Sequence, residues 1–156
     1  MNSQLSAVDL SALLLPVTGR LLIVPSVVVA EIIKRRDLQP PAGAPDWLLG
    51  SIQWHHALIP VISFEALNND QRPDPGAGSR IVILATVTEN TPEHYYAILS
   101  QGVPHLLRLT PDDVRAVEGG MRGPAELMQV SVHGQHAAIP DLEYLERHAA
   151  MGSAAR

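Results

Sequence analysis

Seven histidines are the residues of this chain with the widest range of chemistry, because histidine binds metals, transfers protons and recognises carboxylates. His55 and His56 are adjacent, so on a strand their side chains would point to opposite faces. His133 and His136 flank a glycine and are expected near a hairpin turn. A zinc site needs three or four converging ligands, and neither pair has a histidine–carboxylate cluster in register with it. We therefore interpret these histidines as exposed turn residues, and we expect no metal and no other cofactor.

Nucleophilic chemistry has equally little support. Ser51 and Ser63 flank the histidine pair, but neither lies in the Gly-x-Ser-x-Gly motif that exposes a serine nucleophile. Neither of the glycine-rich phosphate-binding motifs, Gly-x-x-x-x-Gly-Lys and Gly-x-Gly-x-x-Gly, occurs. We expect no catalytic residue and no enzyme. The alternative function is a small β-barrel, metal-dependent hydrolase that uses His55, His56 or His133.

Composition narrows the class of partner. The formal net charge is −5, and Lys34, Arg35 and Arg36 form the only basic cluster, so we expect no nucleic-acid partner. The chain has no cysteine and therefore no disulfide or thiolate site. Its apolar runs are too short to span a bilayer, and the first residues do not resemble a signal peptide. We expect a cytoplasmic protein without membrane insertion.

The elements that would position the histidines are strands. Apolar segments of strand length recur about every ten residues between turn residues, which is typical of an all-β sandwich or barrel. The segments predicted as strands are 13–15, 20–24, 27–33, 50–54, 58–62, 80–88, 94–99, 105–109, 127–132 and 135–139.

The remaining segments are predicted as loops, helices or tail. Residues 68–79 consist almost wholly of turn-forming residues and are predicted to be an exposed connection between two halves of the fold. Residues 110–117 predict one short helical turn, and residues 140–148 predict a C-terminal helix. We expect a single domain over residues 8–150 and a flexible tail over residues 152–156.

Some residues suit protein contact better than chemistry. Trp54 precedes the histidine pair and is either a core residue or a contact residue, since tryptophan is enriched in binding hot spots. Glu31 interrupts the apolar run 27–33 and is read from its residue type as a solvent-facing strand residue. The valines that begin this run are expected to be buried in a central strand or covered by a partner.

Several segments, taken in order, resemble the CheW-like family of chemotaxis adaptor domains. Residues 48–64, LLGSIQWHHALIPVISF, resemble the family's central pattern G-V-I-N-L-R-G-x-x-I-P-V-I-D-L. Residues 23–33 resemble its Y-G-I-P-I-x-x-V-Q-E-I-I element, and residues 41–50 resemble its proline-bearing loop. Residues 80–84 and 130–143 are similar to its R-I-V-V-V strand and its last hairpin with the aspartate-leucine helix start. Together these pieces cover about 130 residues.

The resemblance implies a mainly β fold of two small five-stranded, SH3-like β-barrel subdomains around a shared core, followed by a short helix. It implies a non-enzymatic adaptor that couples methyl-accepting chemotaxis receptors to a CheA-type histidine kinase. The family valine and glutamate fall on Val29 and Glu31, and its arginine-glycine pair falls on His55 and His56. With Trp54, these are the expected partner-binding residues. The replaced arginine-glycine pair suggests a divergent member, for example one serving pilus-based surface motility.

Overall fold

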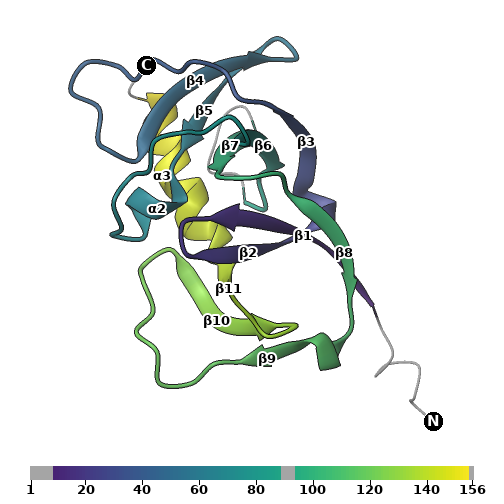
Figure 1. Cartoon of the computed structure of the whole chain (residues 1–156). Helices are drawn as coiled ribbons and strands as arrows, with labels where there is room; N and C mark the ends of the chain where they lie inside the picture. The colour runs from purple at the N-terminus through teal and green to yellow at the C-terminus, as the bar shows by residue number, and fades with distance from the viewer. Residues whose placement is uncertain (1–8, 89–93, 155–156) are drawn as a thin grey trace.

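The computed structural model describes residues 9–88 and 94–154, which form two curved β-sheets flanked by one long helix (Figure 1). Sheet A has the strand order β8-β1-β2-β11-β10-β9, and its only parallel pair is β2 with β11. Its strands are β1 (Leu10–Val17), β2 (Arg20–Pro25), β8 (His105–Leu109), β9 (Val114–Ala116), β10 (Glu126–Val132) and β11 (Gln135–Pro140).

Sheet B has the strand order β3-β6-β7-β5-β4, and its only parallel pair is β5 with β7. Its strands are β3 (Val29–Lys34), β4 (Leu48–Trp54), β5 (Ala57–Ile62), β6 (Arg80–Ala85) and β7 (Tyr95–Ser100). The predicted class, mainly β with two subdomains and a C-terminal helix, is confirmed. The sheets hold six and five strands rather than five each, because the three-residue β9 extends sheet A.

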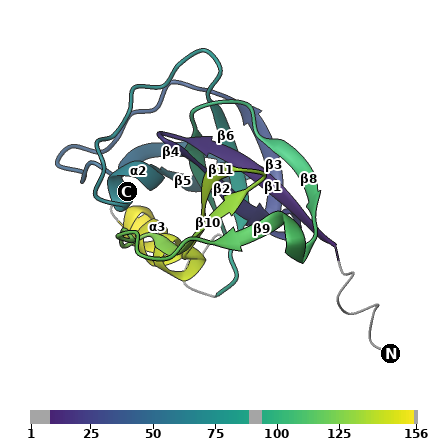
Figure 2. The same cartoon turned by 60° about the horizontal axis from the view of Figure 1, so that its bottom comes forward.

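The two sheets share one apolar core. Its buried side chains come from β1, β2 and β11 of sheet A and from Ala125 before β10, from β5, β6 and β7 of sheet B, and from both helices. Leu15, Ile98 and Leu145 are examples from the three layers, and each is fully buried. One smaller cluster lies inside sheet A and another inside sheet B. The shared cluster therefore joins the two sheets. Figure 2 shows the arrangement of the strands and helices from the sheet A side.

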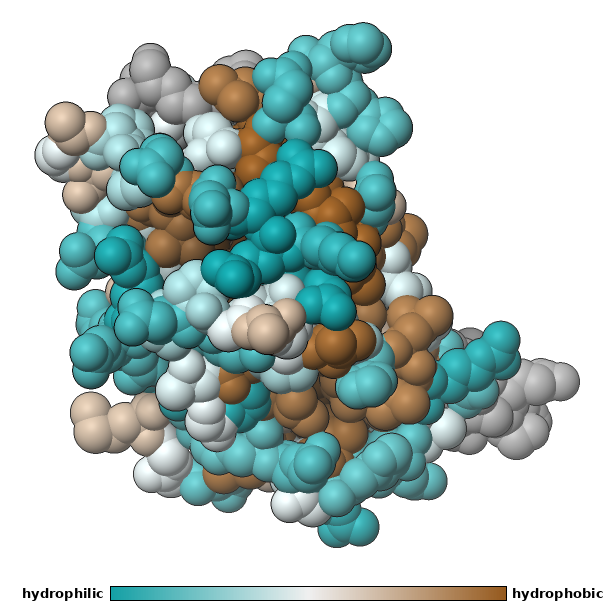
Figure 3. All heavy atoms as spheres, turned by 45° about the horizontal axis from the view of Figure 1, so that its top comes forward, coloured by the Kyte–Doolittle hydropathy of each residue, from teal (hydrophilic) through white to brown (hydrophobic). Residues whose placement is uncertain are grey.

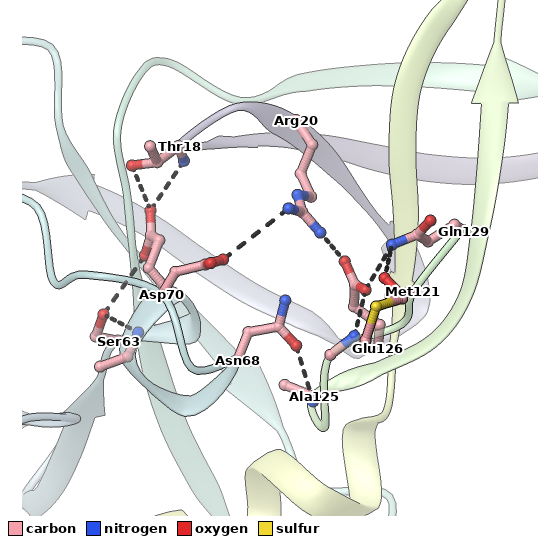
Figure 4. A network of polar contacts seen from close by, with 12 residues as sticks. Thr18, Arg20, Ser63, Asn68, Asp70, Met121, Ala125, Glu126 and Gln129 are labelled. Atoms are coloured by element: carbon pink, nitrogen blue, oxygen red, sulfur yellow. Dashed lines mark hydrogen bonds and ion pairs between the residues drawn. The ribbon is translucent and has the colours of Figure 1, made fainter. Parts of the chain in front are cut away.

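Buried polar side chains also join the sheets. The carboxylate of Glu65, which follows β5, is buried and accepts a hydrogen bond from the Thr18 amide of sheet A at 3.0 Å. Asn68 Oδ1 accepts one from the Ala125 amide, also at 3.0 Å. A buried carboxylate is tolerated only when such partners replace its hydration. The network, drawn in Figure 4, continues through the ion pairs of Arg20 with Asp70 and Glu126.

The segment 68–79 does not connect the two halves of the fold, contrary to the sequence prediction. It follows α2 (Phe64–Leu67) and leads into β6, so it connects two strands of the same sheet. The chain crosses between sheets instead at the 3-10 turn Ser26–Val28 and again between β7 and β8. Turn-rich composition identified an exposed loop, but composition does not determine which strands pair. The 3-10 turn also replaces the predicted start of the strand 27–33 and leaves Val27 87% exposed.

The C-terminal helix α3 (Leu142–Ala154) extends beyond its predicted end. Asp141 caps its start by accepting the Tyr144 amide at 3.2 Å. Gly152, predicted to begin a flexible tail, is buried in the last turn of the helix, and a Cβ there would lie 2.9 Å from the Leu48 side chain. The small residue lets the helix end pack closely on β4; residues 155 and 156 lie outside the described residues.

Midway along α3, the buried Glu146 accepts hydrogen bonds from the amides of Val87 and Thr88 and so holds the segment after β6. Burial raises the pKa of the neighbouring Tyr96 phenol far above its usual range, and the Glu146 charge adds to this effect. Within the described residues, no helix is long and apolar enough to cross a membrane.

Candidate protein-interaction site

The two histidines singled out by the sequence occupy the turn between β4 and β5. Trp54 pairs with Ala57, which leaves His55 and His56 as a two-residue loop. Their φ angles are 46° and 68°, so both central residues are left-handed, as in a type I′ hairpin turn. Asparagine and glycine adopt this geometry with the least strain, and His56 adopts it at a cost. The side chains at this turn therefore project from a strained but well-defined backbone.

Trp54 and Glu31 close sheet B. Trp54 ends β4 and Glu31 lies on β3, and these strands form the two opposite edges of the sheet. Nevertheless, the indole Nε1 of Trp54 donates a hydrogen bond to Glu31 Oε1 at 2.9 Å. Arg36, just beyond β3, also donates a hydrogen bond to β4, to the Gln53 carbonyl at 3.4 Å. Sheet B thus curls until its edge strands meet through side chains, next to the hairpin turn.

Aromatic contacts fix the position of the indole. The Trp54 ring lies 4.8 Å from the Tyr95 ring in an edge-on arrangement and 4.3 Å from the His55 ring. Tyr95 begins β7, and both it and Trp54 are half-buried at the edge of the cluster inside sheet B. We call Glu31, Trp54, His55 and Tyr95 the closure group. Edge-on aromatic pairs add stability beyond area burial, so the group is preorganised.

The charged members of the closure group remain accessible. His55 Nε2 lies 3.8 Å from Glu31 Oε1, with side chains 71% and 46% exposed. A contact between side chains this exposed contributes little to folding. Both side chains can therefore exchange this contact for one with a partner protein at small cost.

Not all the sequence-predicted residues join this group. Val29 lies on β3 with Glu31, but a β-bulge separates them, so Val29 pairs with Leu84 and Glu31 with the adjacent Ile83. Adjacent residues of β6 face opposite sides, and Val29 accordingly packs on the shared core. His56 is exposed at the turn. The structure therefore brings together Glu31, Trp54 and His55 but not Val29.

Sequence reasoning missed Tyr95, because its contact with Trp54 depends on the parallel pairing of β5 with β7, two segments far apart in the chain. Its only sequence signal was its place at the start of an apolar strand. Aromatic residues are few in this chain, with two Trp, three Tyr and one Phe. The packing of two of these six rings at one sheet end is therefore a notable feature of the surface.

The histidines named in the metal-dependent alternative lie on hairpins of two different sheets. His55 and His56 lie on the hairpin of sheet B, whereas His133 lies on the β10–β11 hairpin of sheet A. His133 Nε2 contacts Asp113 Oδ1 at 3.1 Å. Across residues 9–88 and 94–154, no three histidine or acidic side chains are grouped so that they could hold a metal ion.

Comparison with known proteins agrees with the fold. The model of the CheW-like domain family matches residues 11–150. The structure is similar to the crystal structure of the scaffolding protein TtCheW from Thermoanaerobacter tengcongensis, with a TM-score of 0.71 at 14% sequence identity. That match covers 86% of this chain and 90% of the other, and at this identity it shows the fold alone. No curated protein matches the sequence significantly.

Proposed function

The chain belongs to the CheW-like domain family, and on this basis we propose that it is a non-enzymatic cytoplasmic adaptor that couples methyl-accepting chemotaxis receptors to a CheA-type histidine kinase. The family match and the scaffolding role in the name of the similar structure support this proposal. The partner-binding residues in this proposal are Glu31, Trp54, His55 and His56, with Val29 supporting β3 from the core side.

The observation that carries the proposal is the closure group. It combines a fixed indole, whose type is enriched in binding hot spots, with two accessible groups that can be charged. The group stands at the end of a sheet whose strands are held by the shared core, so a partner would meet a surface that needs little ordering. Such preorganisation favours a binding surface.

The histidine turn supports a finer proposal about the partner. Arginine at the position of His55 would always be charged and could bind a carboxylate through two parallel hydrogen bonds, whereas histidine changes charge near neutral pH and offers single contacts. We infer that the cognate kinase or receptor differs at the facing position. By analogy with other divergent adaptors, the pathway proposed is an accessory one such as pilus-based motility. Loss of surface motility with normal swimming in a deletion strain would agree; the reverse pattern would contradict it.

The direct test of coupling is reconstitution. The full chain is mixed with the CheA-type kinase and a receptor signalling domain from the same genome, and complex formation and kinase activity are measured. We expect binding to at least one partner and receptor-dependent kinase activity only when the chain is present. If the chain binds none of the kinases or receptors of its genome, the proposed function is wrong.

A further inference from the structure

A second surface lies beside the closure group, at a cavity of about 320 Å³ between two loops. One wall is formed by residues 35–40, which follow β3, and the other by residues 72–75; Leu49 and Leu99 also line the cavity. This volume is within the range of ligand-binding clefts. Arg36 lines the cavity and also donates to Gln53, the residue before Trp54, so the cavity adjoins the closure group.

Both walls are held in place. Gly50 of β4 has a φ of 144°, and a Cβ at this residue would lie 3.1 Å from Leu38 Cβ and from the Gln39 amide nitrogen. Glycine therefore permits the first loop to lie directly against β4. On the other side, Arg72 donates to the Asp46 carbonyl at 3.2 Å, which ties the second loop to the segment before β4. Both loops that form the cavity are therefore fixed to β4 or to the segment before it.

Three arginines line the cavity and form no salt bridge within the described part of the chain. These are Arg35, Arg36 and Arg72. By contrast, Arg20 is paired with Glu126 in the network between the sheets. The contacts of Arg36 and Arg72 each use one N–H group for a backbone carbonyl, and a guanidinium carries five. Several donors therefore remain available in each side chain.

The local charge is opposite to that of the molecule. Asp37 and Asp74 also line the cavity, so its three arginines leave an excess of one positive charge. The whole chain has a formal charge of −5. Figure 3, with the sheet B end tilted toward the viewer, shows strongly hydrophilic side chains gathered beside apolar ones. An occupant with carboxylates and apolar side chains would complement the arginines and the leucines together.

We propose that this cavity binds an acidic, extended segment of the partner protein, whose carboxylates are held by Arg35, Arg36 and Arg72 while a neighbouring apolar side chain packs on Leu49. Arginine suits this role because its planar fork matches carboxylate geometry. The inference rests on the proposed adaptor function, and it adds the chemical character of the partner segment. The adjoining closure group would contact the same partner.

The test compares the full wild-type chain with one double variant and one single control variant. Arg35→Gln/Arg72→Gln removes two cavity charges, and Arg115→Gln, on the exposed edge strand β9 of sheet A, is the matched control. Binding to the kinase and to the receptor domain is measured at low and at high salt. We expect the double variant to weaken binding of one partner at least about tenfold at low salt, with reduced salt dependence, and the control to bind normally. Equal binding by the double variant and the wild type would overturn the inference and leave the adaptor function standing.

A peptide titration separates failure of the cavity from failure of the adaptor function. Blocked peptides of alternating glutamate and leucine, and of alternating lysine and leucine, are titrated into the labelled chain while backbone amide resonances are followed. Saturable shifts in residues 35–39 with the acidic peptide alone support the inference, and their loss in the double variant confirms the site. Absence of shifts there, or equal shifts with the lysine peptide, overturns it whether or not the kinase binds.

Discussion

Two hairpins of this molecule share a turn geometry but differ in what they do with it. The β4–β5 turn has His55 and His56 at φ 46° and 68°, and the β10–β11 turn has His133 and Gly134 at φ 50° and 80°. In sheet A, glycine accepts the second position without strain, and the histidine is held by Asp113 at 3.1 Å. In sheet B, the second position is occupied by His56, whose backbone is strained there. His55 lies 3.8 Å from Glu31.

The difference separates a turn suited to stability from one suited to recognition. A left-handed residue other than glycine costs about 1–2 kcal/mol, so a second histidine at the sheet B turn is a feature that folding alone would not favour. Strain of this kind is retained where surrounding contacts and function require the side chain. At the sheet B turn the contacts are those of His55 with Trp54 and Glu31 in the closure group, whereas His56 is exposed.

The largest expected effect concerns the residue that precedes the turn. Trp54→Ala removes the bond to Glu31 and the contact with Tyr95, so we expect the free energy of unfolding to fall by about 2–3 kcal/mol and partner binding to be lost. Val132→Ala, at the same place before the sheet A turn, removes a buried side chain and should reduce stability without affecting binding. Denaturant unfolding measures the stability of each variant, and pull-down measures its partner binding. Normal binding by folded Trp54→Ala would refute the role of the indole.

Exchanging the second turn residues tests the strain directly. His56→Gly should raise the free energy of unfolding by about 0.5–1 kcal/mol, because relief of the left-handed strain exceeds the entropy that glycine adds to the unfolded chain. Gly134→His should lower it by a similar amount, since no atom lies within 4 Å of a Cβ there and only the backbone is strained. Urea denaturation of the two variants gives the sign. Changes of the same sign in both variants would show that the turns are not equivalent.

A smaller, pH-dependent effect is expected at the sheet A hairpin. The hydrogen bond from the Thr110 amide, and then that from His133, hold the pKa of Asp113 below its usual range. The folded pKa is the lower one, so the stabilisation is present above the unfolded value of about 3.9 and is lost as pH falls through the folded value. Asp113→Asn should therefore be less stable than the wild type at neutral pH, and the two stability curves should converge in acid. Parallel curves down to pH 2 would contradict this.

Local patterns predicted much of this structure from the sequence. The strand segments and the two-residue loop at His55 and His56 follow from apolar runs and turn residues. Non-local pairing was not readable: the contact of Trp54 with Glu31 exists because sheet B curls until its edges meet, and that of Tyr95 depends on a parallel pair. The bulge that turns Val29 away from Glu31 is one extra residue in a strand, which leaves no signal in the apolar pattern. The sequence therefore identified most of the site residues, but only the structure shows which of them lie together.

We predict that the closure group binds a partner protein and that the β10–β11 hairpin of sheet A does not. The most direct measurement compares His55→Asn with His133→Asn by calorimetric titration of the cognate kinase and receptor domain. Asparagine tolerates the left-handed turn, so both variants should keep their hairpins. We predict that His55→Asn weakens binding at least about fivefold, the loss of roughly 1 kcal/mol expected for one polar contact, whereas His133→Asn binds like the wild type. Equal affinities for the wild type and both variants, or a loss only in His133→Asn, would contradict the account.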